Sequence, residues 1–211
     1  MPLELPDVMP ALPTITGRFE LVPLKKKKHY TDIAKVLEDD RIWSQGFGDT
    51  AQRPLTEEDR IEFIDNFIRA DERIIWAVVH VETDTAIGTT GLAHYSAELE
   101  RCHIGRTVLS TEWWGKGVNH ETKLALMDWL FDCGAGRIEC DVDIQNHRST
   151  SSLVSFGFTP EGTRRRSSQR WDGTWRDMNV LSVVREEWEE IRIRKGTEML
   201  DRYETMADFS V

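Results

Sequence analysis

Two spacings of hydrophobic residues divide the chain into predicted strands and predicted helices. Apolar residues that alternate with polar ones, or that form short runs, predict strands, and apolar residues three and four positions apart predict helices. The predicted strands cover residues 18–24, 74–81, 86–95, 103–109, 137–143, 158 onward and 178–184. The predicted helices cover residues 29–37, 116–131, 148–156 and 186–206, and one more follows Thr56. This order predicts a mixed α/β sheet with helices on both faces.

Local signals mark several ends of these elements. Thr56 stands before three acidic residues, which is typical of a capped helix start. The pair Asp172-Gly173 predicts a hairpin turn between the last two strands. The four lysines at 25–28 are interpreted as a solvated loop, and a patch that binds anions is the other reading.

The pattern predicts one domain with an extension at each end. Residues 1–13 are rich in proline and are interpreted as a tail lying over the surface. Residues 14–188 form the predicted domain, and residues 189–211 form a C-terminal helical extension. Three apolar residues are expected to dock the C-terminal helix: Trp188, Ile191 and Leu200.

Composition narrows the classes of function. The chain has 211 residues, of which 37 are acidic and 27 basic, so its net charge is −10. Non-specific nucleic-acid binding needs clustered cations and is not expected. The chain has no stretch of about 18 apolar residues, so no membrane span is predicted. Cys102, Cys133 and Cys140 form no Cys-x-x-Cys pair, so they are interpreted as free thiols of a cytoplasmic protein, and no metal site is expected.

The segment from Trp113 to Asn119 places two glycines, Gly115 and Gly117, between a predicted strand and a predicted helix. Glycine permits positive φ and close approach of a ligand to the backbone. Free N–H groups at a helix start favour a phosphate or pyrophosphate, although a tight turn alone would also explain the glycines. A Walker loop is excluded because glycine follows the lysine, and a dinucleotide fingerprint is excluded because His120 takes the third glycine position.

The two tryptophans, the Gly-Lys-Gly turn and the amphipathic helix after it resemble the pyrophosphate-binding motif of GNAT superfamily N-acetyltransferases, in particular the RimJ/RimL-like branch. Downstream, the segment from Asn146 to Ser149, followed by Gly157-Phe158, resembles that branch's Asn-x-x-Ser helix. Further matches resemble its closing hairpin and terminus: residues 161–162, 171–177 and 185–188. The resemblance covers about residues 100–188.

The resemblance implies the GNAT fold, with a mixed and mostly antiparallel sheet of about seven strands. Two parallel strands, ending near Leu109 and Asp143, are expected to splay apart and to hold acetyl-CoA, the co-substrate, in the cleft between them. The glycine turn would bind the pyrophosphate, and main chain in the strand before it would align the pantetheine arm. The expected cofactor-binding residues are Thr107, Val108, Trp114, Gly115, Lys116, Gly117, Val118, Asn119, Lys123 and Asn146.

The family's chemistry needs no protein nucleophile, because the acceptor amine attacks the thioester directly. Asn146 is expected near the pantetheine arm and as a helix cap. Ser149 is the expected proton donor to the thiolate, because Leu153 stands where many GNAT enzymes carry a tyrosine acid. His103 is a candidate general base. The other candidates for the base are His94, His120, Glu98 and Glu100.

The function that this implies is acetyl transfer to a primary amine, either a protein N-terminus or a small-molecule amine. The alternative is a degenerate fold that binds coenzyme A or a partner protein without catalysis. A homodimer is expected from the branch. Two side-chain roles stay open: Lys123 reaches a phosphate or lies on the surface, and Trp171 with Trp175 walls the acceptor site or packs the hairpin.

Overall fold

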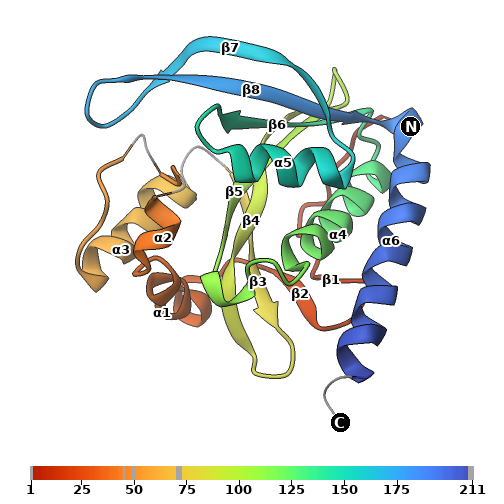
Figure 1. Cartoon of the computed structure of the whole chain (residues 1–211), viewed down its shortest axis with the longest axis horizontal. Helices are drawn as coiled ribbons and strands as arrows, with labels where there is room; N and C mark the ends of the chain where they lie inside the picture. The colour runs from red at the N-terminus through yellow and green to blue at the C-terminus, as the bar shows by residue number, and fades with distance from the viewer. Residues whose placement is uncertain (1, 45, 49–50, 70–72, 209–211) are drawn as a thin grey trace.

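The computed structural model describes residues 2–44, 46–48, 51–69 and 73–208, and these form one eight-stranded sheet. The strand order is β1-β2-β3-β4-β5-β6-β8-β7, and every neighbouring pair is antiparallel except β5 and β6 (Figure 1). The strands are β1 (Leu12–Pro13), β2 (Phe19–Pro23), β3 (Ile74–His80), β4 (Thr85–Ser96), β5 (Arg101–Leu109), β6 (Arg137–Asp143), β7 (Thr159–Gln169) and β8 (Trp175–Val184). The expected mixed, mostly antiparallel sheet is confirmed, with the short β1 added to the seven predicted strands.

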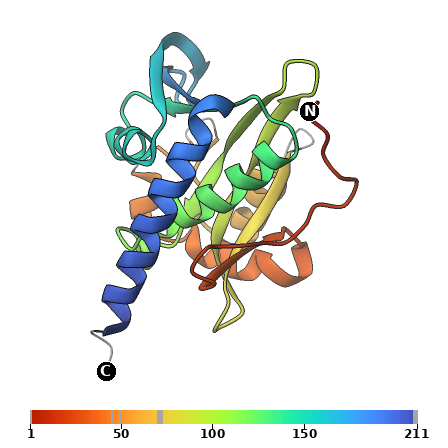
Figure 2. The ribbon, with the colours of Figure 1, turned by 90° about the vertical axis from the view of Figure 1, so that its right-hand side faces the viewer.

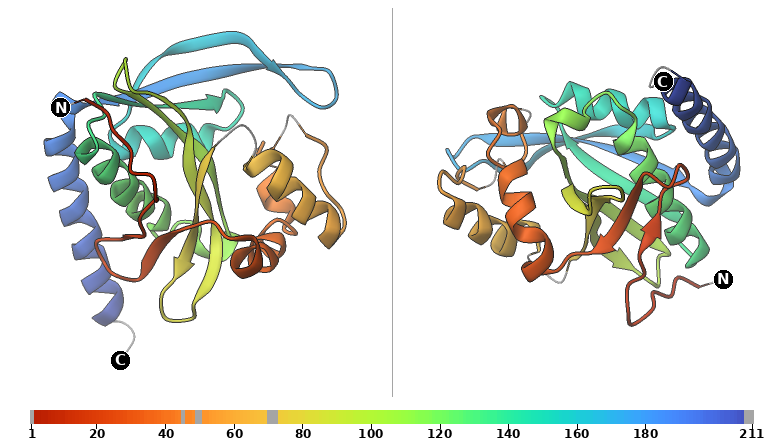
Figure 3. Two further views of the ribbon diagram at one scale, coloured as in Figure 1. Left: turned by 180° about the vertical axis from the view of Figure 1, so that it is seen from behind. Right: turned by 90° about the horizontal axis from the view of Figure 1, so that it is seen from below.

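Helices cover both faces of the sheet (Figures 1 and 3). One face carries α1 (Lys26–Val36), α2 (Asp40–Trp43), α3 (Glu57–Phe63) and the π-helical turn that continues α3 (Ile64–Ile68). The other face carries α4 (Val118–Asp132) and α6 (Arg185–Asp208), which cross it side by side (Figure 2). Two more elements border the cleft described below: a 3-10 turn (Thr111–Trp113) and α5 (His147–Phe156).

The sequence of β3 explains why the sheet is covered on both sides. Trp76 is fully buried in the core that contains the apolar residues of α4. Ala77 and Val79 are buried in the other core, with the apolar residues of α1 and α3. Because successive side chains of a strand point to opposite faces, a strand that is apolar throughout needs a layer on each side.

The N-terminal segment is packed into the fold more firmly than a surface tail would be. Leu3 is 2% exposed and Leu12 is 8% exposed, and both belong to the core beneath α4 and α6. The indole Nε1 of Trp76 donates a hydrogen bond of 2.9 Å to the carbonyl oxygen of Pro10. A plain surface tail therefore does not describe these residues.

Of three predictions about the α-helices, one cap is confirmed, and one helix start and one docking residue differ. The capping box at Thr56 is confirmed, because its side chain accepts from the backbone N–H of Asp59 and the Asp59 side chain accepts from Thr56. The lysine run predicted as a loop instead opens α1, which begins at Lys26. In α6 the predicted docking residue Leu200 is 40% exposed, and its neighbour Met199 is buried in its place.

The parallel pair β5 and β6 is joined over a short length only. Its register runs from Arg101 opposite Arg137 to His103 opposite Glu139, and there the pairing ends. Beyond that point β5 stays paired with β4 up to Leu109, and β6 stays paired with β8 along its whole length. Each strand is therefore held on its outer edge, while the inner edges separate. The expected splayed pair is confirmed.

A bulge in β5 accompanies this separation. Gly105 pairs with Gly91 and Val108 pairs with Thr89, so β5 has one more residue than β4 between these two pairs. Arg106 takes up the extra residue, with a positive φ of 53°. A bulge bends its strand and increases the local twist, which directs β5 away from β6.

Among the residues that the structure describes, no helix is both long enough and apolar enough to cross a membrane.

Shortening Leu3 to alanine should test whether the N-terminal segment belongs to the packed core. We expect Leu3→Ala to lower the free energy of unfolding by about 2–5 kcal/mol, because it leaves a cavity beneath α4 and α6. Val8, in the same segment, is 82% exposed, and Val8→Ala should change the stability by less than about 0.5 kcal/mol. Urea unfolding measures both variants. Equal small effects would show that the segment is not part of the core.

Candidate functional site

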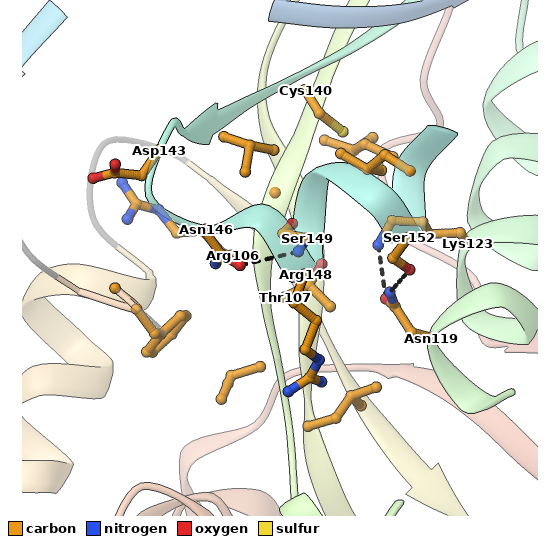
Figure 4. Close-up of a pocket in the computed structure, with 18 of the residues that line it drawn as sticks. Arg106, Thr107, Asn119, Lys123, Cys140, Asp143, Asn146, Arg148, Ser149 and Ser152 are labelled. Carbon is orange, nitrogen blue, oxygen red and sulfur yellow. Dashed lines mark hydrogen bonds between the residues drawn. The ribbon is translucent and has the colours of Figure 1, made fainter. Parts of the chain in front are cut away.

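A cleft of about 920 Å³ opens between the separated ends of β5 and β6 (Figure 4). Most of its walls come from β5, the turn after it, the first turns of α4, the end of β6 and the helix α5. Of the predicted site residues, Lys116 does not line the cleft. The predicted site residues that line it are His103, Thr107, Val108, Trp114, Gly115, Gly117, Val118, Asn119, Lys123, Asn146 and Ser149.

The glycine turn at the N-terminus of α4 presents free backbone N–H donors. Gly115 and Gly117 have φ values of 74° and 86°, and Gly117 is the N-cap of α4. In the part of the chain that the structure describes, the N–H groups of Gly115, Gly117 and Val118 have no hydrogen-bond acceptor. These donors lie at the positive end of the dipole of α4, a position that attracts an anion.

The two tryptophans before the turn hold it against the sheet. Trp113 packs edge-on against Phe19, with ring centroids 5.1 Å apart. The indole Nε1 of Trp114 donates a hydrogen bond of 3.0 Å to the carbonyl oxygen of Leu109. The turn is thereby fixed to the sheet at two points, one on β2 and one at the end of β5. Lys116 lies outside the cleft, with its ammonium 5.1 Å from the centre of the Trp113 ring.

Arg148 reaches across the cleft from α5 to the glycine turn. It lies in the first turn of α5, and its guanidinium stands 3.5 Å from the centre of the Trp114 ring, which precedes the glycine turn. Burial lowers the pKa of Arg148 from its usual value. The sequence prediction missed this residue because nothing in its local pattern tells which way a helix residue points.

Asn146 and Ser149 lie together at the start of α5, where Figure 4 shows them side by side. Asn146 is the N-cap, and its side-chain oxygen accepts a hydrogen bond of 3.0 Å from the backbone N–H of Ser149. Ser149 is half-buried. Leu153, one turn further on, is buried in the core. An apolar side chain therefore fills the position of the usual tyrosine acid.

A polar network at the floor of the cleft ties α4 to α5. The buried Lys123 ammonium donates to the Asn119 side-chain oxygen at 2.8 Å, and the Asn119 amide donates to the Ser152 hydroxyl at 3.2 Å (Figure 4). A ring nitrogen of His120 lies 3.1 Å from the same hydroxyl. Burial lowers the pKa of Lys123, and burial with the Lys123 charge lowers the pKa of His120 to about 4. His120 is therefore neutral at neutral pH, and Lys123 is a buried residue of the floor.

His103 lies at the fork where β5 and β6 part, and its side chain is mostly buried. Its ring stacks on the ring of His94 with centroids 4.8 Å apart, and its Nδ1 lies 3.8 Å from a carboxylate oxygen of Glu139. Burial lowers the pKa of His103, and the nearby carboxylates of Asp141 and Glu139 oppose this shift. A neutral imidazole facing a cleft can accept a proton. Of the other candidate bases, His94, Glu98 and Glu100 do not line the cleft.

The same fork brings possible metal ligands together. The ligand atoms of His94, His103 and Glu139 lie within 4.8 Å of one another. However, Glu139 is already paired with Arg137 at 3.0 Å. A guanidinium on the only carboxylate of the group disfavours a second cation there.

The far side of the cleft is bordered by basic and polar groups. Asp143 ends β6 and accepts from Arg170 at 2.6 Å and from Arg176 at 2.8 Å. Arg106, at the bulge, covers the ring of Phe67 at 4.2 Å. The hairpin tryptophans, Trp171 and Trp175, are 63% and 45% exposed and do not line the cleft. The hairpin reaches the cleft through Ser167, Ser168, Arg176 and Met178 instead.

The sequence of this chain was compared with those of known protein families and proteins. Residues 18–159 match the family described as acetyltransferase (GNAT) domain. The uncharacterized N-acetyltransferase p20 of Bacillus licheniformis is 30% identical over 131 residues, which are 62% of this chain and 72% of that protein.

Two solved structures share the fold. A GCN5-related N-acetyltransferase from Brucella melitensis has a TM-score of 0.83 and 20% identity, over 93% of this chain and 87% of that one. RimL, a ribosomal α-N-protein acetyltransferase in complex with coenzyme A, has a TM-score of 0.67 and 16% identity, over 83% of this chain and 98% of that one. At these identities the likeness shows the fold alone. The family match covers more than half of the chain, and the chain therefore belongs to the GNAT acetyltransferase family.

Proposed function

We propose that this protein transfers an acetyl group from acetyl-CoA to a primary amine by direct attack within a ternary complex. The main support for this proposal is the cleft between β5 and β6, which ends at a glycine turn with free N–H donors. Membership of the GNAT family supports acetyl transfer. Two solved relatives of this fold contain the cofactor: RimL with coenzyme A, and a microcin C7 self-immunity acetyltransferase with acetyl-CoA and AMP.

In this proposal the cofactor lies along the open edge of β5. The N–H groups of Gly117 and Val118 would bind the pyrophosphate, as a helix start does. The pantetheine arm would extend past Thr107 and Val108 as if it were another strand, since that edge of β5 has no partner in β6. The thioester would then lie near the bulge at Arg106, where a backbone N–H can polarise its carbonyl.

The proposed reaction forms one bond and breaks one bond. The neutral amine attacks the carbonyl carbon, a tetrahedral oxyanion forms, and the carbon–sulfur bond then breaks. His103 would take the proton from the ammonium form of the acceptor, directly or through water. Ser149 would supply a proton to the departing thiolate, directly or through water, and would regain one from the amine nitrogen, which loses its second proton as the amide forms. Asn146 would hold Ser149 in place through the helix cap.

The buried cysteine of the cleft supports direct attack over a covalent intermediate. Cys140 lines the cleft, but burial raises the pKa of its thiol to about 12. A thiol with this pKa stays protonated at neutral pH and is a weak nucleophile.

The acceptor that we propose is an amine of a protein N-terminus or of a small molecule. The RimJ/RimL-like branch, a homodimer and a cytoplasmic location stay predictions. In the alternative, the fold binds coenzyme A or a partner protein without catalysis. Thiol release by the wild type with a panel of amines and peptide N-termini separates the two: release with at least one acceptor supports the enzyme, and none with any acceptor supports the binding module.

Blocking the glycine turn should abolish cofactor binding. We expect Gly117→Glu to weaken acetyl-CoA binding by at least about a hundredfold, because a carboxylate would face the pyrophosphate and because φ of 86° is strained for glutamate. Isothermal titration measures the affinity. Gly17→Glu is the matched control, since Gly17 also has a positive φ and has no neighbouring atoms within 4 Å of its Cβ position. Unchanged binding by Gly117→Glu would contradict this site.

The pH dependence of the rate should identify the base. Because the pKa of His103 is lowered from 6.5, its imidazole is neutral and able to accept a proton above that lowered pKa. We expect the acidic limb of the kcat/KM profile to have an apparent pKa below 6.5. His103→Gln should remove this limb and slow the reaction about a hundredfold. His80→Gln, outside the cleft, should keep the wild-type profile, and the same limb in His103→Gln would exclude His103 as the base.

Removing the Ser149 hydroxyl should slow thiolate departure without weakening cofactor binding. We expect Ser149→Ala to lower kcat about 10- to 100-fold with little change in the KM for acetyl-CoA. Thr150→Val removes a hydroxyl from the same helix at a position that does not line the cleft and should leave kcat within about twofold of the wild type. Steady-state thiol release measures both variants. Equal kcat values for Ser149→Ala and the wild type would assign the proton donor elsewhere.

A further inference from the structure

The C-terminal helix brings an arginine to the glycine turn. α6 runs alongside α4 and lies wholly beyond residue 159, where the family match ends (Figures 1 and 2). Near its end, the guanidinium of Arg202 donates a hydrogen bond to the carbonyl oxygen of Gly115. Residues that are 87 positions apart in the sequence thereby meet at the start of α4.

Arg202 borders the space that the free amides of the turn also border. Three atoms of its side chain lie 3.7–4.0 Å from the point at which a Cβ on Gly117 would stand. Arg202 lines the main cleft and also a second cavity of about 130 Å³ beside α4 and α6. Because Gly117 has no side chain, no Cβ stands between its backbone and the guanidinium at this corner.

The charges nearby leave Arg202 without an acidic partner. Glu121 and Glu198 also line the second cavity. Glu121 is paired with Arg18, and Glu198 is paired with Lys195. Throughout the described ranges, no carboxylate lies within ion-pair distance of Arg202, whose hydrogen-bond partner is a neutral carbonyl. An exposed cation beside free N–H donors is a combination that suits an anion.

We propose that Arg202 is a phosphate-binding residue at the nucleotide end of the coenzyme A site. This inference rests on the function proposed above and adds to it a phosphate-binding residue from outside the part of the chain that matches the family. A guanidinium offers paired N–H donors that match two oxygens of one phosphate. The phosphate is either the diphosphate or the 3′-phosphate of coenzyme A, which share the same oxygen chemistry.

The contact with Gly115 holds the guanidinium in position before the ligand binds. Only one of its nitrogens donates to the carbonyl oxygen, which leaves the other donors available. A side chain already held beside the turn loses less conformational entropy on binding. The same contact stabilises the turn, so the test must separate phosphate binding from support of the loop.

Isothermal titration of the whole chain with coenzyme A and with 3′-dephospho-coenzyme A tests the proposal. We expect Arg202→Ala to weaken coenzyme A binding about tenfold or more at low salt, and Arg202→Lys to weaken it less. The matched control is Arg192→Ala, which removes the same charge from α6 at a residue that is paired with Glu189 and lines neither cavity. It should bind as the wild type does. Added salt should weaken binding by the wild type more steeply than binding by Arg202→Ala, because a charge–charge contact is screened.

The two ligands identify the phosphate. A loss with coenzyme A alone supports the 3′-phosphate, and an equal loss with both ligands supports the diphosphate. Equal affinities of wild type and Arg202→Ala would overturn the proposal. So would a loss of affinity with unchanged salt dependence, because Arg202 would then act only by holding Gly115. No binding of either ligand by the wild type would overturn the proposed function as well.

Discussion

The backbone pairing between β5 and β6 ends at His103 and Glu139, and the position of every group in the cleft depends on that end. Both strands continue, each held on its outer side by an antiparallel neighbour, while their inner edges no longer pair. The bulge at Arg106 bends β5 in the region where it leaves β6. The separation exposes a strand edge with free backbone groups inside the molecule, which is a site that an extended ligand can fill.

Charge is distributed unevenly between the whole chain and the cleft. The chain carries a net charge of −10, yet the cleft is bordered by Arg106, Arg148 and Arg202 together with the start of α4. Net charge therefore says little about the ligand, whereas the local field favours an anionic cofactor. In contrast, burial keeps the imidazole of His120 neutral and lowers the pKa of His103. Arg148 and Arg202 thus border the glycine turn, and imidazoles with lowered pKa values lie on the floor and at the fork.

Periodicity and turn chemistry predicted the order of strands and helices, because both arise from neighbouring residues. The residues of the glycine turn could be predicted for the same reason. Features that depend on packing between distant segments could not. Leu3 is buried only because the N-terminal segment reaches the far end of α4, and Arg202 reaches Gly115 only because α6 lies beside α4. Met199 is buried in place of Leu200 because the rotation of α6 about its axis is set by its contacts.

We propose that the open edge of β5 and the glycine turn together hold an extended, phosphate-bearing cofactor. Amide hydrogen exchange with and without acetyl-CoA tests this directly, because it reports on each backbone N–H. We expect slower exchange at residues 107–108 and 115–119 when acetyl-CoA is present. We expect no change along β3, none of whose residues lines the cleft. Unchanged exchange at the turn, or protection confined to other segments, would contradict the account.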